Sequence, residues 1–260
     1  MIAAPAAPSG LGVRGWFDLA RAGNFPSVGS NVLASLALSS TGDAIPPAGT
    51  LAIAVLAGIL VYAGGATFND VADAEFDRRH RPERAIPRGL VSRGTAAGVA
   101  AAEMAAGLAL LIAAGASAVW AAALAATILL YDWIHKRWSG AVILMAGCRV
   151  LLAVTLASLP GHELTTPFLA WAAALFIYIV TLSLIARREY QVAVSPVTAG
   201  NTNVSAGRAA RLGRMVGRLL AFIPLIDAVA LLLMGLWGPA LACALAVPAG
   251  RWAQRLAASN

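Results

Sequence analysis

Charged residues are scarce in this sequence. They make up 12% of its 260 residues, whereas soluble globular domains carry about 25%. Half of the charge that usually keeps a folded surface in water is therefore missing, while apolar residues make up 60% of the chain and the mean hydropathy is +0.77. This balance argues against a soluble domain and predicts an all-α protein whose helices lie in a bilayer.

Cysteine and histidine are scarce as well. The two cysteines, Cys148 and Cys243, fall in separate apolar stretches, and the three histidines show no ligand spacing with them. A disulfide framework and a Cys/His metal centre are therefore not expected. We interpret both cysteines as small apolar side chains.

Long apolar runs, in contrast, are abundant. Stretches of about 18–22 residues recur along the chain, and each is long enough to cross a hydrocarbon core of about 30 Å. We predict a single transmembrane helical bundle over residues 1–260 with eight or nine spans. The last identified span is the weakest, because Pro239 and Pro248 fall inside it. The identified spans are 27–45, 49–68, 95–114, 116–134, 140–159, 166–186, 215–235 and 237–254.

The cations gather on one side of this predicted bundle. Eighteen of the nineteen lysine and arginine residues lie in the terminal segments or in every second connection, and the alternate connections carry none. Because positive residues mark the cytoplasmic side, we predict both termini there, together with two long polar connections, about 69–94 and 187–213. The protein is then a multi-pass protein of a bacterial-type inner membrane. This topology and anionic lipid headgroups explain the net charge of +7, so no nucleic-acid partner is expected.

The first long connection carries oxygen-bearing side chains at a regular spacing. If the second span continues as a helix through Arg79, then Asn69, Asp73 and Asp77 follow one another at four-residue intervals. Each is turned about 40° from the one before, so the three share one helix face. Pro82 ends the helix.

Such a face suits a magnesium-diphosphate site. Oxygen ligands on neighbouring turns are typical of Mg²⁺, which keeps several waters and shares its site with substrate phosphates. Arg81 or Arg84, just after the helix, would bind the phosphate oxygens left over. The alternative is a solvated loop whose acids and bases pair with one another.

These residues carry a resemblance to a known family. The stretch from Asn69 to Gly89 reads NDVADAEFDRRHRPERAIPRG and resembles the first aspartate-rich motif of the UbiA superfamily of intramembrane prenyltransferases. The segment YDWIHKR, which begins at Tyr131 after the fourth span, is similar to the family's Y-x-x-x-K segment, with a spacing one residue longer. The resemblance covers most of the chain in architecture and about 35 residues in motif.

The resemblance implies a helical bundle around a lipid-accessible cavity. It also implies an activity, the Mg²⁺-dependent transfer of an isoprenyl group from an allylic diphosphate to an aromatic or other lipophilic acceptor. In the resulting assignment, Asn69, Asp73 and Asp77 hold Mg²⁺, and Asp73, Asp77 and Lys136 are the catalytic residues. Arg81, Arg84, Lys136, Arg149, Arg187 and Arg188 bind diphosphate, and Phe68, Tyr131 and Tyr178 line the cavity.

One family feature is missing. A second aspartate-rich motif is expected at the end of the sixth span, but that region reads TLSLIARREYQ from Thr181, with Glu189 as its only acid. This variant looks most like the EboC-type branch of the superfamily. Either Arg187 and Arg188 replace the charge of a second metal, or one Mg²⁺ suffices, or the transferase activity is altered or lost.

Three charged residues lie deep inside predicted spans, at least eight residues from either end. Arg149, Glu103 and Asp227 would each be costly in contact with lipid. Arg149 is expected either to pair with one of the two acids or to face the diphosphate from inside the cavity.

The sequence therefore predicts a membrane-embedded prenyltransferase. A non-catalytic binding or transport protein derived from the same bundle is the alternative. A CDP-alcohol phosphotransferase also uses spaced aspartates on membrane helices, but the order of residues in this connection does not follow that family's pattern.

Overall fold

The chain folds into helices. The computed structural model describes residues 11–42, 47–194 and 215–258, without the side chains of 188–194 and 256–258. No strand occurs among these residues, and the only β-type pairing in them is an isolated bridge between Ser40 and His162. The predicted all-α fold is confirmed. The helices are α1 (Val13–Leu19), η1 (Ala22–Asn24), α2 (Phe25–Ser39), α3 (Ala48–His80), α4 (Arg93–Ala113), α5 (Ala118–Ile134), α6 (Ala141–Leu156), α7 (Thr166–Val194), α9 (Ile223–Leu233) and α10 (Trp237–Ala258).

A helix occupies each of the eight predicted spans, although the boundaries differ. The first is shorter than predicted, because α2 ends at Ser39 and Ser40 has an extended backbone. The last is longer, and Pro239 is accommodated in the first turn of α10, where no intrahelical N–H bond is lost. Within the described residues, four helices are long and apolar enough to cross a membrane, and α5 and α6 are shorter apolar helices. The four are Ala48–His80, Arg93–Ala113, Thr166–Arg187 and Met215–Leu233.

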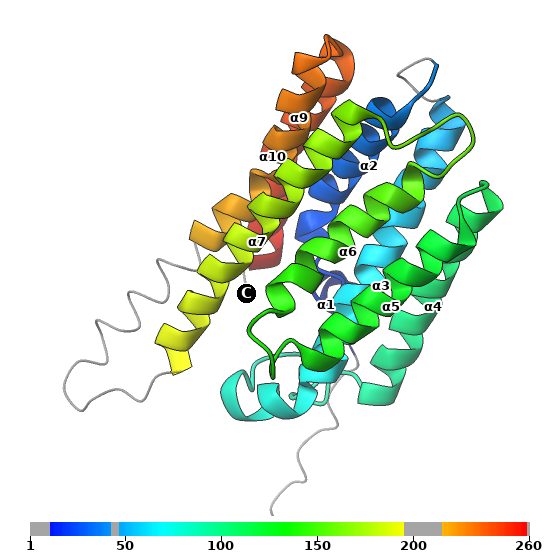
Figure 1. Cartoon of the computed structure of the whole chain (residues 1–260). Helices are drawn as coiled ribbons and strands as arrows, with labels where there is room; N and C mark the ends of the chain where they lie inside the picture. The colour runs from blue at the N-terminus through cyan, green and yellow to red at the C-terminus, as the bar shows by residue number, and fades with distance from the viewer. Residues whose placement is uncertain (1–10, 43–46, 195–214, 259–260) are drawn as a thin grey trace, which may run out of the picture.

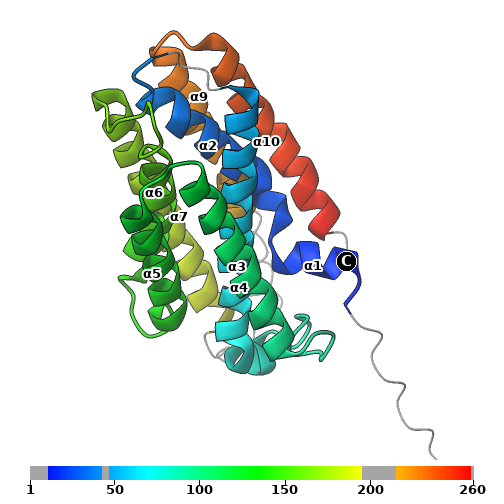
Figure 2. The same ribbon diagram turned by 90° about the vertical axis from the view of Figure 1, so that its right-hand side faces the viewer.

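The long helices run side by side as a bundle, and α1 lies across one end of it (Figures 1 and 2). Two large buried apolar clusters hold the bundle together. One joins α3, α4 and α5, the other joins α7, α9 and α10, and α2 and α6 contribute to both. Leu36 of α2, for example, belongs to the first cluster and Leu38 to the second. These two helices therefore form the middle of the bundle.

The closest helix packing is between α3 and α4, and two glycines make it possible. A Cβ atom on Gly64 would lie 2.7 Å from the carbonyl oxygen of Ala100, and one on Gly107 would lie 2.7 Å from that of Ala57. No side chain fits at either distance. The two backbones are therefore in direct contact, which holds α3 firmly against its neighbour.

The last turns of α3 continue past the apolar run and carry the predicted motif. The helix is 33 residues long, about 50 Å at 1.5 Å per residue. It ends at His80, and the backbone N–H of Arg81 bonds to the carbonyl of Asp77 at 2.7 Å. The predicted continuation of the second span is thus confirmed, and only residues 81–92 form a loop before α4. This loop is anchored by Ile86 and Val91, which are buried with Leu19 of α1.

Candidate active site

Four polar residues near the end of α3 point in two directions and are here called the fan: Asn69, Asp70, Asp73 and Asp77. They lie at the end of the bundle where α1, loop 81–92 and the end of α5 meet, and this end is here called the motif end. Successive helical residues turn by about 100°, so Asn69 and Asp73 lie about 40° apart and Asp70 and Asp77 about 20° apart. The first two residues face α5 and form the α5 edge of the fan. The other two face the loop and form the loop edge.

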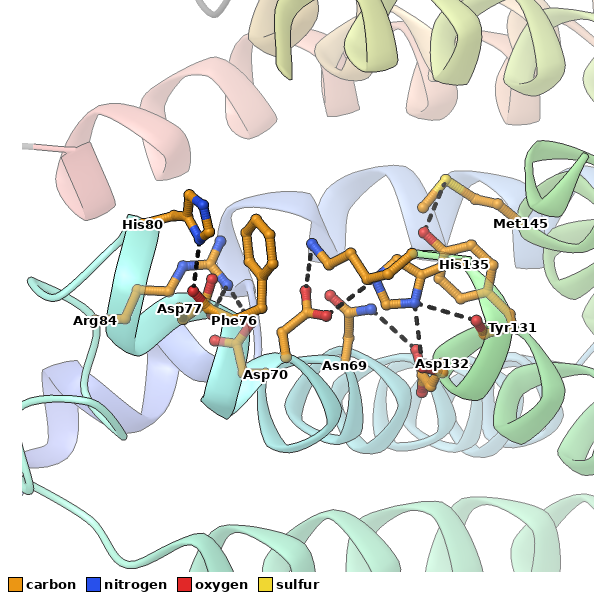
Figure 3. Close-up of polar contacts among 12 residues, drawn as sticks. Asn69, Asp70, Phe76, Asp77, His80, Arg84, Tyr131, Asp132, His135 and Met145 are labelled. Carbon is orange, nitrogen blue, oxygen red and sulfur yellow. Dashed lines mark hydrogen bonds and ion pairs between the residues drawn. The ribbon is translucent and has the colours of Figure 1, made fainter. Parts of the chain in front are cut away.

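At the α5 edge, each polar residue of α3 meets a polar residue from the end of α5 (Figure 3). Buried Asp73 lies 3.1 Å from Nε2 of His135 and 3.0 Å from Nζ of Lys136, one partner on each carboxylate oxygen. Asn69 donates from Nδ2 to Oδ1 of Asp132 at 3.0 Å. The predicted proximity of Asp73 and Lys136 is therefore present in the structure.

At the loop edge, one arginine joins both acids. Nη1 of Arg84 lies 2.8 Å from Oδ1 of Asp70 and 3.0 Å from Oδ2 of Asp77. Asp77 is almost fully buried, and its Oδ1 has no hydrogen-bond partner among the described residues. Arg84 therefore returns from the loop to the helix that precedes it and offsets part of the negative charge of this edge.

Arg21 links the two edges from another part of the chain. Its Nη2 donates to Oδ1 of Asn69 at 3.1 Å and to Oδ1 of Asp70 at 3.2 Å. The backbone of Arg21 is left-handed (φ 50°), the only positive φ outside glycine in the described residues. Such a conformation is unfavourable for a residue with a long side chain and is often found at functional sites. The turn before η1 thus directs this guanidinium at the motif.

The fan provides oxygen atoms that can bind a metal ion, but it does not form a complete set of metal ligands. Among the described residues, no three Asp, Glu, His or Cys side chains lie together as a metal-binding group. Carboxylate and amide oxygens nevertheless line successive turns, and in the described part of the chain Oδ1 of Asp77 and Oδ2 of Asp132 are buried without a hydrogen-bond partner. This donor set fits Mg²⁺, which binds through one or two carboxylates plus substrate phosphates.

The remaining predicted diphosphate ligands lie at different distances from the fan. Arg81 directly follows α3. Arg187 donates from Nη1 to the carbonyls of Trp138 and Ser139, at 3.1 and 3.0 Å, close in sequence to Lys136. The side chain of Arg188 is outside the described residues, so its predicted role stays a prediction.

The predicted cavity aromatics are dispersed. Tyr131 stacks on His135 with 5.0 Å between ring centroids, next to the α5 edge. Phe68 precedes Asn69 on α3 and packs against the cluster of α3, α4 and α5. Tyr178 donates its hydroxyl to the carbonyl of Leu219 at 2.8 Å and packs in the other cluster. Their common role as cavity walls stays a prediction.

Of the two alternatives expected for Arg149, a pair with Glu103 or Asp227 is not present as a direct ion pair among the described residues. Asn31 of α2 lies between Arg149 and Asp227. Asn31 accepts a hydrogen bond from Arg149 through Oδ1 and donates Nδ2 to Asp227 at 2.7 and 2.9 Å. A neutral amide bonded to both charges takes the place of a direct ion pair.

The rest of this buried network is also satisfied by hydrogen bonds. Asp227 accepts from Ser30 and from Nε1 of Trp171, the latter at 2.9 Å. Arg149 donates to Ser27 and lies over the ring of Tyr62 at 5.5 Å. That Arg149 also faces the diphosphate stays a prediction.

Four residues of the motif end were not assigned a role from the sequence. Asp70 adjoins the motif, and Asp132 and His135 lie in the segment that contains Lys136, so proximity in sequence was an available signal. Arg21 lies 48 residues before Asn69, and in the sequence it is indistinguishable from the other cations that mark membrane orientation.

A bundle of apolar helices with acids and cations gathered at one end is an integral membrane protein with a polar site at its motif end. The UbiA prenyltransferase family model matches residues 29–259, which is most of the chain. The protein therefore belongs to the UbiA prenyltransferase family.

Individual relatives match shorter segments. The chain is 44% identical over 73 residues to digeranylgeranylglyceryl phosphate synthase of Methanoculleus marisnigri, which is 28% of this chain and 25% of the relative. It is 41% identical over 93 residues to the enzyme of the same name from Thermococcus gammatolerans, 35% of this chain and 34% of the relative. The chain thus spans only about a quarter to a third of these relatives.

A solved structure supports the fold over nearly the whole length. It comes from work on digeranylgeranylglyceryl phosphate synthase in membranes and aligns with a TM-score of 0.58. The alignment covers 94% of this chain and 96% of that one, at 17% sequence identity. At this identity the likeness concerns the fold alone, and it agrees with the bundle expected from the sequence.

Proposed function

We propose that this protein is a Mg²⁺-dependent intramembrane prenyltransferase that moves an isoprenyl group from an allylic diphosphate to a lipophilic acceptor. The observation that carries the proposal is the fan of α3, where buried acids face three basic side chains. Asp73 meets His135 and Lys136, and Asp77 meets Arg84, all within 3.1 Å. Membership of the UbiA family supports the same activity.

The chemistry requires a leaving group and protection from water. Asp73 and Asp77 would hold Mg²⁺, which stabilises the negative charge that develops on the leaving diphosphate. Lys136 and Arg84, held at the same acids, would bind diphosphate oxygens, and their fixed positive charges favour the transition state. The apolar helices exclude water from the allylic cation until the acceptor captures it.

The acceptor is proposed at a coarser level. The names of the relatives refer to a glyceryl phosphate lipid, which favours a lipid acceptor over a free aromatic acid. The proposal is limited to a lipophilic acceptor that reaches the motif end from the bilayer.

The test is diphosphate release by purified protein incubated with Mg²⁺ and a panel of isoprenyl diphosphates. Asp73→Ala and Asp77→Ala should each abolish Mg²⁺-dependent binding of an uncleavable isoprenyl thiodiphosphate. Glu75→Ala is the matched control, because Glu75 lies on the same helix but is exposed and pairs with Arg78. Normal Mg²⁺ dependence in either motif variant would show that the site is wrong.

One observation favours the non-catalytic alternative. Among the described residues the second aspartate-rich motif has no structural counterpart at the motif end, since the end of α7 presents Arg187, bonded to the carbonyls of Trp138 and Ser139, where the family resemblance leads us to expect acids. A protein that only binds the diphosphate would retain the thiodiphosphate with Mg²⁺ but release no diphosphate from any donor.

We also propose that the motif end faces the cytoplasm, because the sequence places its cations there. Glu83 is an exposed residue of loop 81–92, and a cysteine at this position reports the orientation. The native Cys148 and Cys243 are half-buried and buried, which keeps background labelling low. Labelling of the Glu83→Cys variant by an impermeant reagent in intact cells would contradict the orientation.

A further inference from the structure

Asp132 differs from the other acids at the motif end. It lies on α5 opposite α3 and is only 8% exposed. Its Oδ1 accepts the hydrogen bond from Asn69, and its Oδ2 is buried without a hydrogen-bond partner among the described residues (Figure 3). Asp73 and Asp77 each contact a basic side chain, whereas the hydrogen bond of Asp132 is to a neutral amide.

That hydrogen bond and the one from Arg21 to the amide oxygen together determine which way the amide of Asn69 points. A side-chain amide has a donating nitrogen and an accepting oxygen that are nearly equal in size, so its surroundings decide its orientation. A carboxylate only accepts, so Asp132 selects the nitrogen of Asn69. The oxygen of Asn69 is thereby turned to the other side, where Arg21 donates to it at 3.1 Å.

We propose that Asp132 is a positioning residue for the substrate site, which it serves by holding the oxygen of Asn69 toward the metal and the diphosphate. This inference rests on the proposed function, because it gives Asn69 a ligand role in that reaction. A buried carboxylate with an oxygen that has no hydrogen-bond partner among the described residues is costly and calls for an explanation. Orientation of the first motif residue supplies one.

The direct test is Asp132→Asn in the full-length purified protein. An asparagine can donate as well as accept, so position 132 no longer selects the nitrogen of Asn69, and the exposed hydrogen bond from Arg21 is left as the contact that favours the present direction. Partners that orient a metal ligand typically affect metal affinity by about 10–100-fold. The Mg²⁺ concentration that gives half-maximal binding of the isoprenyl thiodiphosphate should therefore rise about tenfold or more, with the thermal unfolding temperature close to that of the unaltered protein.

A purely structural role gives the opposite result. If the hydrogen bond only holds α3 and α5 together, Asp132→Asn lowers the unfolding temperature and leaves the Mg²⁺ dependence unchanged, which overturns the proposal. Glu103→Gln is the control, since Glu103 on α4 also has a buried oxygen without a partner among the described residues but lies outside the motif end. It should bind the analogue normally.

The same Asp132→Asn substitution made in a protein that already carries Asn69→Ala tests whether Asp132 acts through Asn69. In an Asn69→Ala protein there is no amide to orient, so Asp132→Asn should cause no further change in Mg²⁺ dependence. A further loss of similar size would mean that Asp132 acts on the ligand directly and would overturn the positioning role.

Two further proteins serve as controls, one that restores a hydrogen bond between the two positions and one that tests the proposed function separately. Asn69→Asp combined with Asp132→Asn keeps a hydrogen bond between the two positions, with an oxygen still facing the site, and should fold and bind better than Asn69→Ala. Binding as weak as that of Asn69→Ala would count against the proposal. Asp73→Asn separates failure of the proposed function from failure of the positioning role. If Asp73→Asn binds the thiodiphosphate with normal Mg²⁺ dependence, the proposed function itself is contradicted. If Asp73→Asn loses this binding but Asp132→Asn keeps it, only the positioning role is contradicted.

Discussion

Two polar regions of this bundle differ in how their acidic and basic side chains are paired. At the motif end, acids meet basic side chains directly, as Asp73 meets Lys136 at 3.0 Å and Asp77 meets Arg84 at 3.0 Å. In the middle of the bundle, Arg149 and Asp227 are also both present, but Asn31 lies between them and bonds to both. The first region contains mainly ion pairs, with the hydrogen bond from Asn69 to Asp132 beside them, and the second is a closed hydrogen-bond network.

The difference indicates which region can exchange partners. An ion pair near the end of a bundle can be replaced by a metal ion on the acid and a phosphate on the base, and both charges remain satisfied. The network around Asp227 already uses the donors of Ser30, Asn31 and Trp171, so a ligand would have to break several hydrogen bonds to enter. We therefore propose binding at the motif end and helix association through the central network.

The largest effect is expected for Asp73→Asn, which removes charge from the exchangeable region. Prenyl transfer should fall about 100-fold or more, the size of effect seen when a group that stabilises the transition state is lost. The asparagine can still bond to His135 or Lys136, so the unfolding temperature should change little. Steady-state transfer and a thermal melt in detergent measure the two quantities, and a large loss of stability would contradict the contrast between the regions.

Asp227→Leu should have the reverse profile. It leaves the donors of Ser30, Asn31 and Trp171 buried without an acceptor, and the loss of a buried charged partner costs about 3–5 kcal/mol of stability. Chemical unfolding in detergent measures this, and the molecules that remain folded should bind the thiodiphosphate normally. Weakened binding in the folded fraction would instead connect the two regions and favour a substrate role for Arg149.

A smaller effect is expected for the double variant Arg187→Gln, Arg188→Gln. If these guanidinium groups replace the charge of a second metal, diphosphate binding should weaken about tenfold, since hydrogen bonds to charged groups contribute about 1.5–3 kcal/mol. Metal titration of the unaltered protein should then fit a single class of Mg²⁺ sites. Normal binding and turnover in the double variant would mean that both arginines serve only membrane orientation.

The smallest effect is expected for Arg78→Gln, which lies outside both regions. Arg78 and Glu75 form an exposed pair at 2.9 Å on α3, and pairs of this kind contribute about 0.5 kcal/mol or less. Transfer and stability should both stay close to those of the unaltered protein. A strong loss of activity would extend the site to the far side of α3.

The sequence predicted the positions of the helices because the apolar runs are long and the cations alternate between connections. It predicted the boundaries less well. The end of α2 at Ser39 coincides with the run SSTGD over residues 39–43, which is typical of a loop, but the predicted span was extended through it to residue 45. The close contact of α3 with α4 was also not predicted, because Gly64 and Gly107 are two among twenty-five glycines, and only the paired backbones show why these two matter.

For the candidate site, the spacing of residues in the sequence predicted which side chains of α3 lie together, but it did not predict which residues of other segments contact them. The shared face of Asn69, Asp73 and Asp77 follows from helical geometry alone. Arg21 depends on a left-handed turn far away in the sequence, and the separation of Arg149 from Asp227 depends on an asparagine of α2 that has no charge of its own. Contacts of this kind arise from tertiary packing, which periodicity does not encode.

The continuity of α3 has a consequence for how this site can vary in evolution. The same uninterrupted backbone crosses the bundle and carries the fan, so the depth of the acids and the direction they face cannot change independently. One residue inserted between Gly64 and Asn69 would raise the fan by about 1.5 Å and rotate it by about 100°, away from α5. An insertion of seven residues would restore the direction to within about 20° but would displace the acids by about 10 Å. Homologues should therefore conserve the length of this segment without gaps, even where its side chains differ.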